Sequence, residues 1–357
     1  MKTYIKFLLN IFTISFFKIF FIFFGVVLLT NILEQAEFFK NSDLSFVYQI
    51  FLSFLNTPSI LFEILPFIFF ISTQIFFIGL INKNELEIFK YSGLNNNNIV
   101  KIISAYSFIL GIIFVIIFYN MAAFMKNSYL LTKSKYADDG KYLAVINKNG
   151  LWIKDEIDGQ INMINASKIQ NEFLLNVTIS QFSNDFDIIR TIQSEKVDIS
   201  TLNWIILAPT ISTNNINKVM NKIEMRSNFD QKKINSLFSN LSSLGIIDLL
   251  NLRKNYKSLN YSIVNIDSHL YRIILYPVYL TLMTIFSAVI MFSIEYQKKS
   301  IYKISFGIFI SVVVYYINYF FNILGISEKI PVILSIILPL IILSIINMIS
   351  IIKLNEK

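Results

Sequence analysis

The sequence contains no cysteine and a single histidine, His269, among its 357 residues. Without cysteine the chain can have neither a disulfide framework nor a thiolate metal site. A single histidine also argues against a metal site built from several imidazole ligands. We therefore expect no bound metal and no other cofactor.

Motifs for enzymatic chemistry are missing as well. The chain has no G-x-x-x-x-G-K-[ST] segment and no other Gly-rich loop that could cradle phosphates. It also lacks G-x-S-x-G, H-E-x-x-H and any nucleophile with a plausible histidine base. His269 is interpreted as an interfacial side chain with one wet end. The chain is predicted not to be an enzyme, and any ATP that drives it must bind to another subunit.

Apolar residues are abundant, because 55% of the chain is hydrophobic and its mean hydropathy is positive. This composition predicts a membrane protein. The net charge of +8 is interpreted as lysine on the inner side of a membrane and not as a surface for nucleic acid. The N-terminal apolar stretch is longer than that of a signal peptide and no small-residue cleavage site follows, so it predicts a retained first span.

Six apolar stretches are long enough to cross a bilayer, which takes about 20 residues. They lie at 12–33, 58–81, 99–124, 270–294, 302–324 and 330–352. Between the third and fourth, residues 127–267 are richer in charged residues, Asn and Ser and contain no such run. The chain is therefore predicted to have three transmembrane helices in 1–126, an inserted domain in 127–267, and three more transmembrane helices in 268–357.

Lysines in the short loops indicate the orientation, because positive charge is enriched on the cytoplasmic side. One side has Lys2, Lys6, Lys83, Lys90, Lys101, Lys298, Lys299, Lys303, Lys353 and Lys357. The opposite side has mixed charges after the first span and only Glu328 and Lys329 after the fifth. Both termini are predicted to be cytoplasmic and the inserted domain to lie outside.

The inserted domain has the pattern of antiparallel strands. Asn149-Gly150 and Asp158-Gly159 are turn signals about ten residues apart within LAVINKNGLWIKDEIDGQINMI. Further strands are predicted in EFLLNVTISQF, DIIRTIQSEKVDI and LNWIILAPTIS. Their number favours a sandwich or a jelly roll. From Lys232 the pattern becomes helical and predicts one or two amphipathic helices that lead into the fourth span.

A short amphipathic segment, NELEIFKYSGLN at 84–95, joins the second and third spans. Asn84 and Glu87 have the spacing of a capping box, and Gly93 is placed to end the helix in a left-handed conformation. Leu86, Phe89 and Leu94 fall on one face. Such a helix either lies on the membrane surface or docks into a groove of a cytoplasmic partner.

This segment resembles the one that follows the second span in the LptF/LptG permeases, in which a Glu-Leu pair precedes a short helix that ends at Gly. Three further stretches are similar to that family: GLWIKD at 150–155, HLYRIILYP at 269–277 and ILEQ at 32–35. The first and last of them resemble LptG more than LptF. The layout of three spans, an outer β domain and three spans is also similar to that of the family.

The resemblance implies a permease subunit of an ABC transporter that extracts lipopolysaccharide from the inner membrane and passes it toward the outer membrane. It implies six transmembrane helices, three plus three, around an inserted periplasmic domain like a β-jellyroll. The implied partners are an LptF-like permease chain, a cytoplasmic LptB-like ATPase dimer and an LptC-like periplasmic bridge.

The resemblance also implies roles for individual residues. The coupling helix that contacts the ATPase would use Glu85, Leu86, Glu87, Phe89 and Gly93.

Substrate contacts would come from Glu34 at the end of the first span and from Lys133 and Lys135 after the third. The chain has Asn31 and Ser59 where some relatives have basic residues. An anionic lipid needs an apolar cavity rimmed by cations, and Tyr315 and Tyr319 of the aromatic fifth span are candidates to line it.

Two other functions are compatible with the residues alone. One is a different ABC-type permease or mechanotransmitter with an outer domain. The other is a membrane receptor or scaffold whose short helix recruits a signalling partner, and this reading predicts no dependence on an ATPase.

Overall fold

The computed structural model describes residues 3–40, 45–134, 151–157, 160–170, 172–183, 187–213, 216–231, 233–234, 240–258, 261–293 and 300–355. Contacts between residues divide the chain into two compact units. The helical unit comprises residues 1–126, 245–249 and 263–357, and the β unit comprises 127–244 and 250–262.

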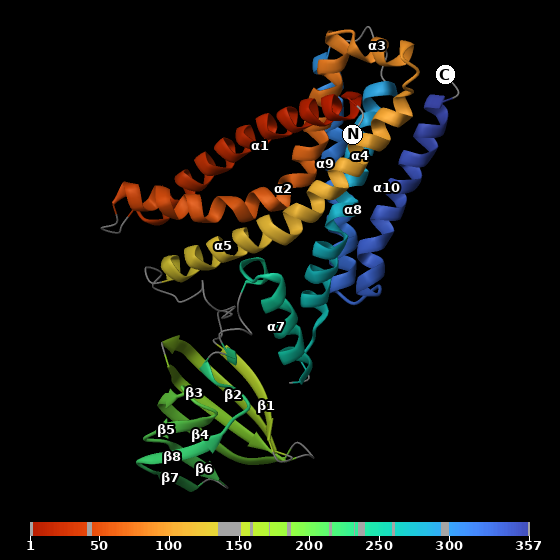
Figure 1. The fold of residues 1–357 in the computed structure, drawn as a ribbon. Helices are drawn as coiled ribbons and strands as arrows, with labels where there is room; N and C mark the ends of the chain where they lie inside the picture. Colours follow the sequence, from red (N-terminus) through yellow and green to blue (C-terminus); the bar gives the residue numbers. More distant parts are fainter. Residues whose placement is uncertain are drawn as a thin grey trace. The chain divides into compact units, whose positions relative to one another are not determined.

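The six predicted transmembrane helices are confirmed (Figure 1). The first two are α1 (Thr3–Phe38) and α2 (Phe46–Asn82), and the third is continuous through α4 (Asn96–Ile113), a π-helical turn (Phe114–Phe118) and α5 (Tyr119–Ser134). The last three are α8 (Val264–Ser293), α9 (Ser300–Ile326) and α10 (Val332–Asn355). The predicted ranges were too short for α1 and α2, because hydropathy marks only the apolar part and both helices continue through polar residues at their ends.

Helix α8 lies at the centre of the helical unit, in contact with α2, α4, α9 and α10. Gly111 permits α4 to approach α8 closely, since a Cβ atom at this position would lie 2.8 Å from Cα of Pro277 in α8. Polar side chains also join the helices: Ser287 Oγ donates to the carbonyl of Phe70 at 2.7 Å, and Asn347 Nδ2 donates to that of Leu282 at 3.0 Å. Small residues and interhelical hydrogen bonds are the usual means of helix packing in a membrane.

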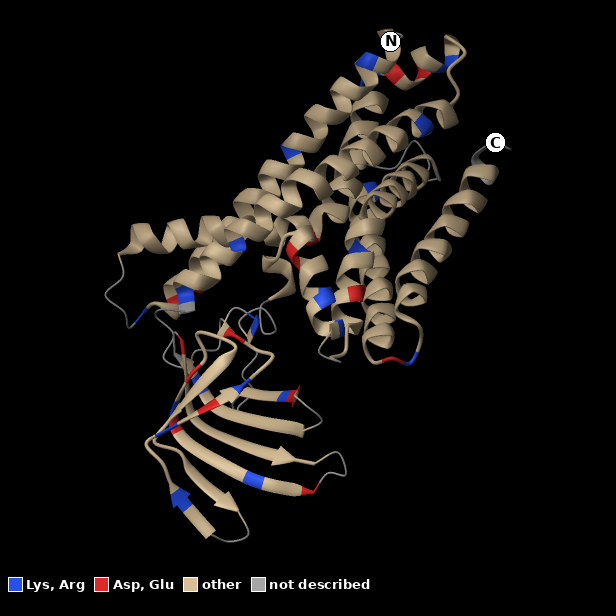
Figure 2. Cartoon of the chain, turned by 60° about the horizontal axis from the view of Figure 1, so that its bottom comes forward, with Lys and Arg blue, Asp and Glu red and all other residues tan. Residues whose placement is uncertain are grey.

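Phenylalanine rings fill the space between α1, α2 and the π-helical turn. The ring of Phe16 lies 4.9 Å from that of Phe69 and 5.6 Å from that of Phe114, measured between centroids. Phe12 meets Phe76 edge to face at 5.8 Å. Such tilted and edge-on pairs are the favoured arrangements of aromatic rings. Charged residues are sparse along the helices (Figure 2).

The β unit contains the predicted antiparallel domain as a single curled sheet, and not as two facing sheets (Figure 1). The hydrogen-bonded order is β1-β2-β3-β4-β5-β8, with β6 paired to β4 and β7 paired to β6. The strands are β1 (Leu151–Ile157), β2 (Gln160–Gln170), β3 (Phe173–Phe182), β4 (Ile188–Asp198), β5 (Asn203–Leu207), β6 (Thr210–Thr213), β7 (Ile216–Val219) and β8 (Lys222–Arg226).

The predicted strands correspond to β1 through β6. The two turn signals Asn149-Gly150 and Asp158-Gly159 lie outside the described residues. LNWIILAPTIS forms two strands instead of one, because Ala208 has φ = +43° and interrupts the extended backbone between β5 and β6. Strands β7 and β8 were not predicted from the sequence, since their apolar residues are few and separated by Asn and Lys.

One face of the sheet buries the apolar core of the β unit. Alternate residues of β1 point into it, so Leu151 and Ile153 are buried whereas Trp152 is exposed. Trp204 is fully buried, and its Nε1 donates to the carbonyl of Phe229 at 2.6 Å. The core consists of Leu151, Ile153, Ile164, Ala166, Leu174, Val177, Ile179, Ile192, Val197, Ile199, Trp204, Ile206, Phe229 and Ile234.

A polar contact joins β1 to the segment that follows β8. Asp155 is buried, and its Oδ2 accepts from Ser227 Oγ at 2.8 Å and from the backbone N of Asn228 at 3.1 Å. Its Oδ1 accepts from Asn228 Nδ2 at 2.8 Å. The chain then forms a short 3₁₀ turn (Leu241–Ser243) and α7 (Ile246–Ser258), as the helical pattern predicted. Residues 227–228 therefore connect the two ends of the curled sheet.

Candidate functional site

The segment between α2 and α4 forms a short helix, α3 (Glu85–Tyr91), as predicted. Gly93 has φ = +82°, which confirms the left-handed residue at its end. The predicted capping box is wrong: Asn84 itself has φ = +58°, and its side chain makes no capping hydrogen bond. Asparagine tolerates this left-handed conformation, but an N-cap side chain reaches the helix from an extended backbone.

The apolar face of α3 packs against its own chain. Leu86 and Leu94 are buried, and the ring of Phe89 lies 6.0 Å from that of Phe7 in α1. The exposed apolar side chains are instead Ile88 and Tyr91, at 60% and 90% of their full accessibility. The outward surface of α3 is therefore formed by Ile88 and Tyr91, which the sequence reasoning did not select.

The charged residues of α3 differ in their surroundings. Glu87 and Lys90 are exposed. Glu85 is half-buried, and its Oε2 is shielded from solvent without a hydrogen-bond partner in the described part of the chain. Because a buried carboxylate oxygen without a donor is costly, Glu85 is a position at which another molecule's donor or cation would be stabilising.

The predicted substrate residues lie in different environments. Glu34 is exposed near the end of α1. Lys133 is buried in the β unit, where its Nζ donates to the hydroxyl of Tyr129 at 2.8 Å, and Lys135 lies outside the described residues. Tyr315 and Tyr319 of α9 are both exposed and stack with their ring centroids 6.4 Å apart. The structure thus brings the two tyrosines of this set into contact with each other.

Sequence reasoning missed a group of ionisable residues on α2, α5 and α8. Glu63 is the only charged residue of α2 and is exposed. It interacts electrostatically with Lys126 of α5, and both Lys126 and Arg272 of α8 interact with His269. The carboxylate of Glu63 within a long apolar stretch was the sequence signal from which this group could have been predicted.

Aromatic contacts join the three helices around these charges. The ring of Phe62 stacks on Tyr276 at 4.4 Å and lies 5.1 Å from Tyr119. The hydroxyl of Tyr276 donates to the carbonyl of Phe62, and the hydroxyl of Tyr119 lies 3.0 Å from Nε2 of His269. His269, predicted to be an interfacial side chain, thus takes part in a contact between α5 and α8.

A comparison with protein families identifies one that spans nearly the whole chain. The family described as "Lipopolysaccharide export system permease LptF/LptG" matches residues 6–353. No curated protein matches the chain at a significant level. The matched range includes α3, every described strand of the β unit and the six membrane helices, apart from the first three residues of α1 and the last two of α10.

Proposed function

The chain belongs to the LptF/LptG family of lipopolysaccharide export permeases, and we propose that it is the LptG-like subunit of an ABC transporter that extracts lipopolysaccharide from the inner membrane. It is a multi-pass membrane protein with six helices long and apolar enough to span a bilayer. In the proposed transporter it pairs with an LptF-like chain, and the ATP is hydrolysed by a separate ATPase dimer.

The observation that carries the ATPase partnership is the outward surface of α3. Ile88 and Tyr91 expose apolar area on a seven-residue helix, and Glu85 has a shielded carboxylate oxygen without a donor among the described residues. Apolar anchors beside a polar group in need of a partner are the typical content of a helix-in-groove contact. We propose that Ile88 and Tyr91 enter a groove of the ATPase and that a donor there pairs with Glu85.

The lysine distribution supports the orientation of this transporter. Lys83 precedes α3 and Lys90 lies in it, and Lys6 lies in the first turn of α1, all on the side that the lysines mark as cytoplasmic. In this orientation both termini are cytoplasmic and the β unit is periplasmic. ATP-driven closure of the partner dimer would then move the membrane helices, and the lipid would leave toward the periplasm.

The edges of the curled sheet suggest where a periplasmic bridge would bind. The edge of β1 that faces away from β2 already has partners in its own chain. The Tyr261 hydroxyl lies 3.1 Å from the backbone N of Lys154 and 3.3 Å from its carbonyl O, and Asn228 Nδ2 donates to the Glu156 carbonyl at 2.9 Å.

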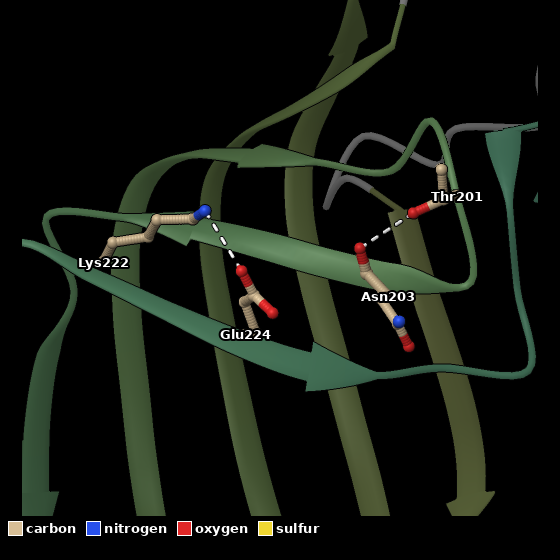
Figure 3. A network of polar contacts seen from close by, with 4 residues as sticks. All are labelled: Thr201, Asn203, Lys222 and Glu224. Carbon is tan, nitrogen blue, oxygen red and sulfur yellow. Dashed lines mark hydrogen bonds and ion pairs between the residues drawn. The ribbon is translucent and has the colours of Figure 1, made fainter.

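The β7–β8 edge is different. All four residues of β7 are exposed, Ile216 and Val219 among them, and β8 carries the surface ion pair Lys222–Glu224 beside β5 at 3.1 Å (Figure 3). An exposed strand with unpaired backbone groups is a template for another strand. We propose that an LptC-like bridge adds a strand to this edge and receives the lipid there.

The proposal is tested by co-expressing the permease pair with its ATPase subunit and purifying the complex through a tag on this chain. Replacing Ile88 and Tyr91 by Glu is expected to remove the ATPase while the LptF-like chain is retained. Glu85→Gln is expected to weaken ATPase retention without affecting the permease pair. The matched control is Ile247→Glu, because Ile247 is also a highly exposed isoleucine, at 74%. ATPase recovery at the unmodified level from the double variant would refute this docking surface.

A further inference from the structure

The first two membrane helices are much longer than a bilayer requires. Helix α1 has 36 residues and α2 has 37, which correspond to about 54 and about 56 Å of helix, whereas α10 has 24 residues, or about 36 Å. The hydrocarbon layer is about 30 Å thick. If α1 and α2 stood upright from their cytoplasmic ends, residues 29–38 of α1 and 46–57 of α2 would lie beyond the acyl chains. These two stretches are called the outer hairpin end below.

The outer hairpin end has polar residues between its helices and apolar residues outside. Asn56 Nδ2 donates to Asn31 Oδ1 at 2.8 Å, Asn31 Nδ2 donates to Thr57 Oγ1 at 3.3 Å, and all three residues are buried. A pair of helices in water has the reverse arrangement, because burial of apolar side chains drives their packing. The outward face of α2, called the α2 apolar face, consists of the exposed residues Phe46, Val47, Ile50, Phe51 and Phe54.

The path of α2 keeps this face close to the membrane. Pro58 and Pro66 lie inside α2, and a proline in a helix interior removes a backbone hydrogen bond and bends the helix. The first half of α2 runs at a large angle to α8 and α10, which belong to the same helical unit (Figure 1). A bent helix of this length can remain within one bilayer because part of it lies along the membrane plane.

Acyl chains suit the α2 apolar face better than a second protein does. Helix contacts within a membrane use small and polar residues, whereas this face has only Phe, Ile and Val. Ser53 and Thr57, the small and polar residues of the same stretch, are buried. On α1, exposed apolar side chains also continue from the middle of the span into the outer hairpin end, at Ile14, Phe17, Phe21, Leu29 and Leu33.

We propose that the outer hairpin end lies in the outer leaflet, with the α2 apolar face against the acyl chains of bilayer lipids, and does not project from the membrane. Glu34, Glu37 and Lys40 are exposed near the end of α1 and lie at the level of the headgroups. Because α2 has no charged residue before Glu63, its first half places no charge among the acyl chains. This placement requires only that α1 and α2 are membrane helices, so it does not depend on which lipid the protein exports.

The test uses spin labels on the permease complex in nanodiscs of phosphatidylethanolamine and phosphatidylglycerol. Since the chain has no cysteine, Val47→Cys, Phe51→Cys or Phe54→Cys each supplies one labelling position in it, and the unmodified complex gives the background. Power-saturation EPR measures collisions with oxygen, which concentrates among acyl chains, and with a water-soluble Ni²⁺ chelate. The ratio of oxygen to chelate collisions is expected to be several-fold higher at these three positions than in the control Glu195→Cys, an exposed position of β4.

Two results would overturn the proposal. Frequent collisions with the chelate, as in Glu195→Cys, would show that the outer hairpin end stands in water. Rare collisions with both reagents would show that a second protein covers the α2 apolar face.

Phe51→Trp tests the same placement without a bulky label, because the face stays apolar and aromatic. Lipids brominated on their acyl chains are expected to quench the fluorescence that this variant adds to the unmodified complex. If the added fluorescence is not quenched, the α2 apolar face does not contact acyl chains and the proposal is wrong.

Discussion

Removal of the Asp155 carboxylate should release β1 from the curled sheet. Asp155 is 1% exposed and accepts three hydrogen bonds from Ser227 and Asn228. In Asp155→Ala, the buried Ser227 hydroxyl and the Asn228 backbone N–H lose their acceptor. Each unsatisfied buried donor costs about 1–3 kcal/mol, and the variant also avoids the desolvation of a carboxylate. We expect a net loss of about 3 kcal/mol in the local opening free energy of β1.

This loss can be measured by hydrogen exchange of the intact membrane protein, followed by mass spectrometry of peptides that cover residues 151–157. A change of about 3 kcal/mol corresponds to roughly a hundredfold lower protection of the β1 amides. Asp155→Asn should be milder, about 1–2 kcal/mol, because the amide keeps one acceptor but turns an NH₂ group toward a donor.

The control is Lys222→Ala, which removes an exposed ion pair and should change protection by less than about 1 kcal/mol. If Asp155→Ala lowers the protection of β1 no more than Lys222→Ala does, the assignment of Asp155 as the contact that joins the two ends of the sheet is wrong.

Three further predictions concern packing, pH and the sheet edge. Gly111→Val should lower the free energy of unfolding of the helical unit by about 1–3 kcal/mol in thermal unfolding scans, because the valine side chain would collide with Pro277. The control is Gly25→Ala, whose added Cβ meets no atom within 4 Å and which should be neutral or stabilising in the same scans. Burial raises the pKa of Tyr256 and of Tyr261 above the ordinary value near 10. The stability that these neutral phenols contribute is complete below pH 10 and is lost as the pH rises through the raised pKa. Denaturant unfolding from pH 8 to 12 should therefore show a fall in the free energy of unfolding, and this fall should be smaller in the double Tyr→Phe variant. Replacing Ile216 and Val219 of β7 by Lys should abolish co-purification of an LptC-like bridge. The control Trp152→Lys, on β1, should retain the bridge. The opposite result would place the bridge on β1.

The sequence by itself determined the class of protein and the order of its elements. Six apolar stretches must become helices in a membrane, because every backbone hydrogen bond has to be made within the segment. The alternation in LWIKDEI and the period of NELEIFKYSGLN likewise specified a strand and a short helix, since these patterns depend only on neighbouring residues. Gly93 could be assigned for the same reason, because only the local backbone needs its positive φ.

The tertiary structure decided which side chains remain available to other molecules. The apolar face of α3 was visible in the sequence, but only the contact of Phe89 with Phe7, 82 residues earlier in the chain, shows that this face packs internally and leaves Ile88 and Tyr91 exposed. Glu63 and His269 are also far from Lys126 in sequence, and they come near it only because α5 meets α2 and α8, as in the contacts of Tyr119 with Phe62 and with His269. Local periodicity carries no information about which helices meet, because that choice depends on how small residues and ring shapes fit between them.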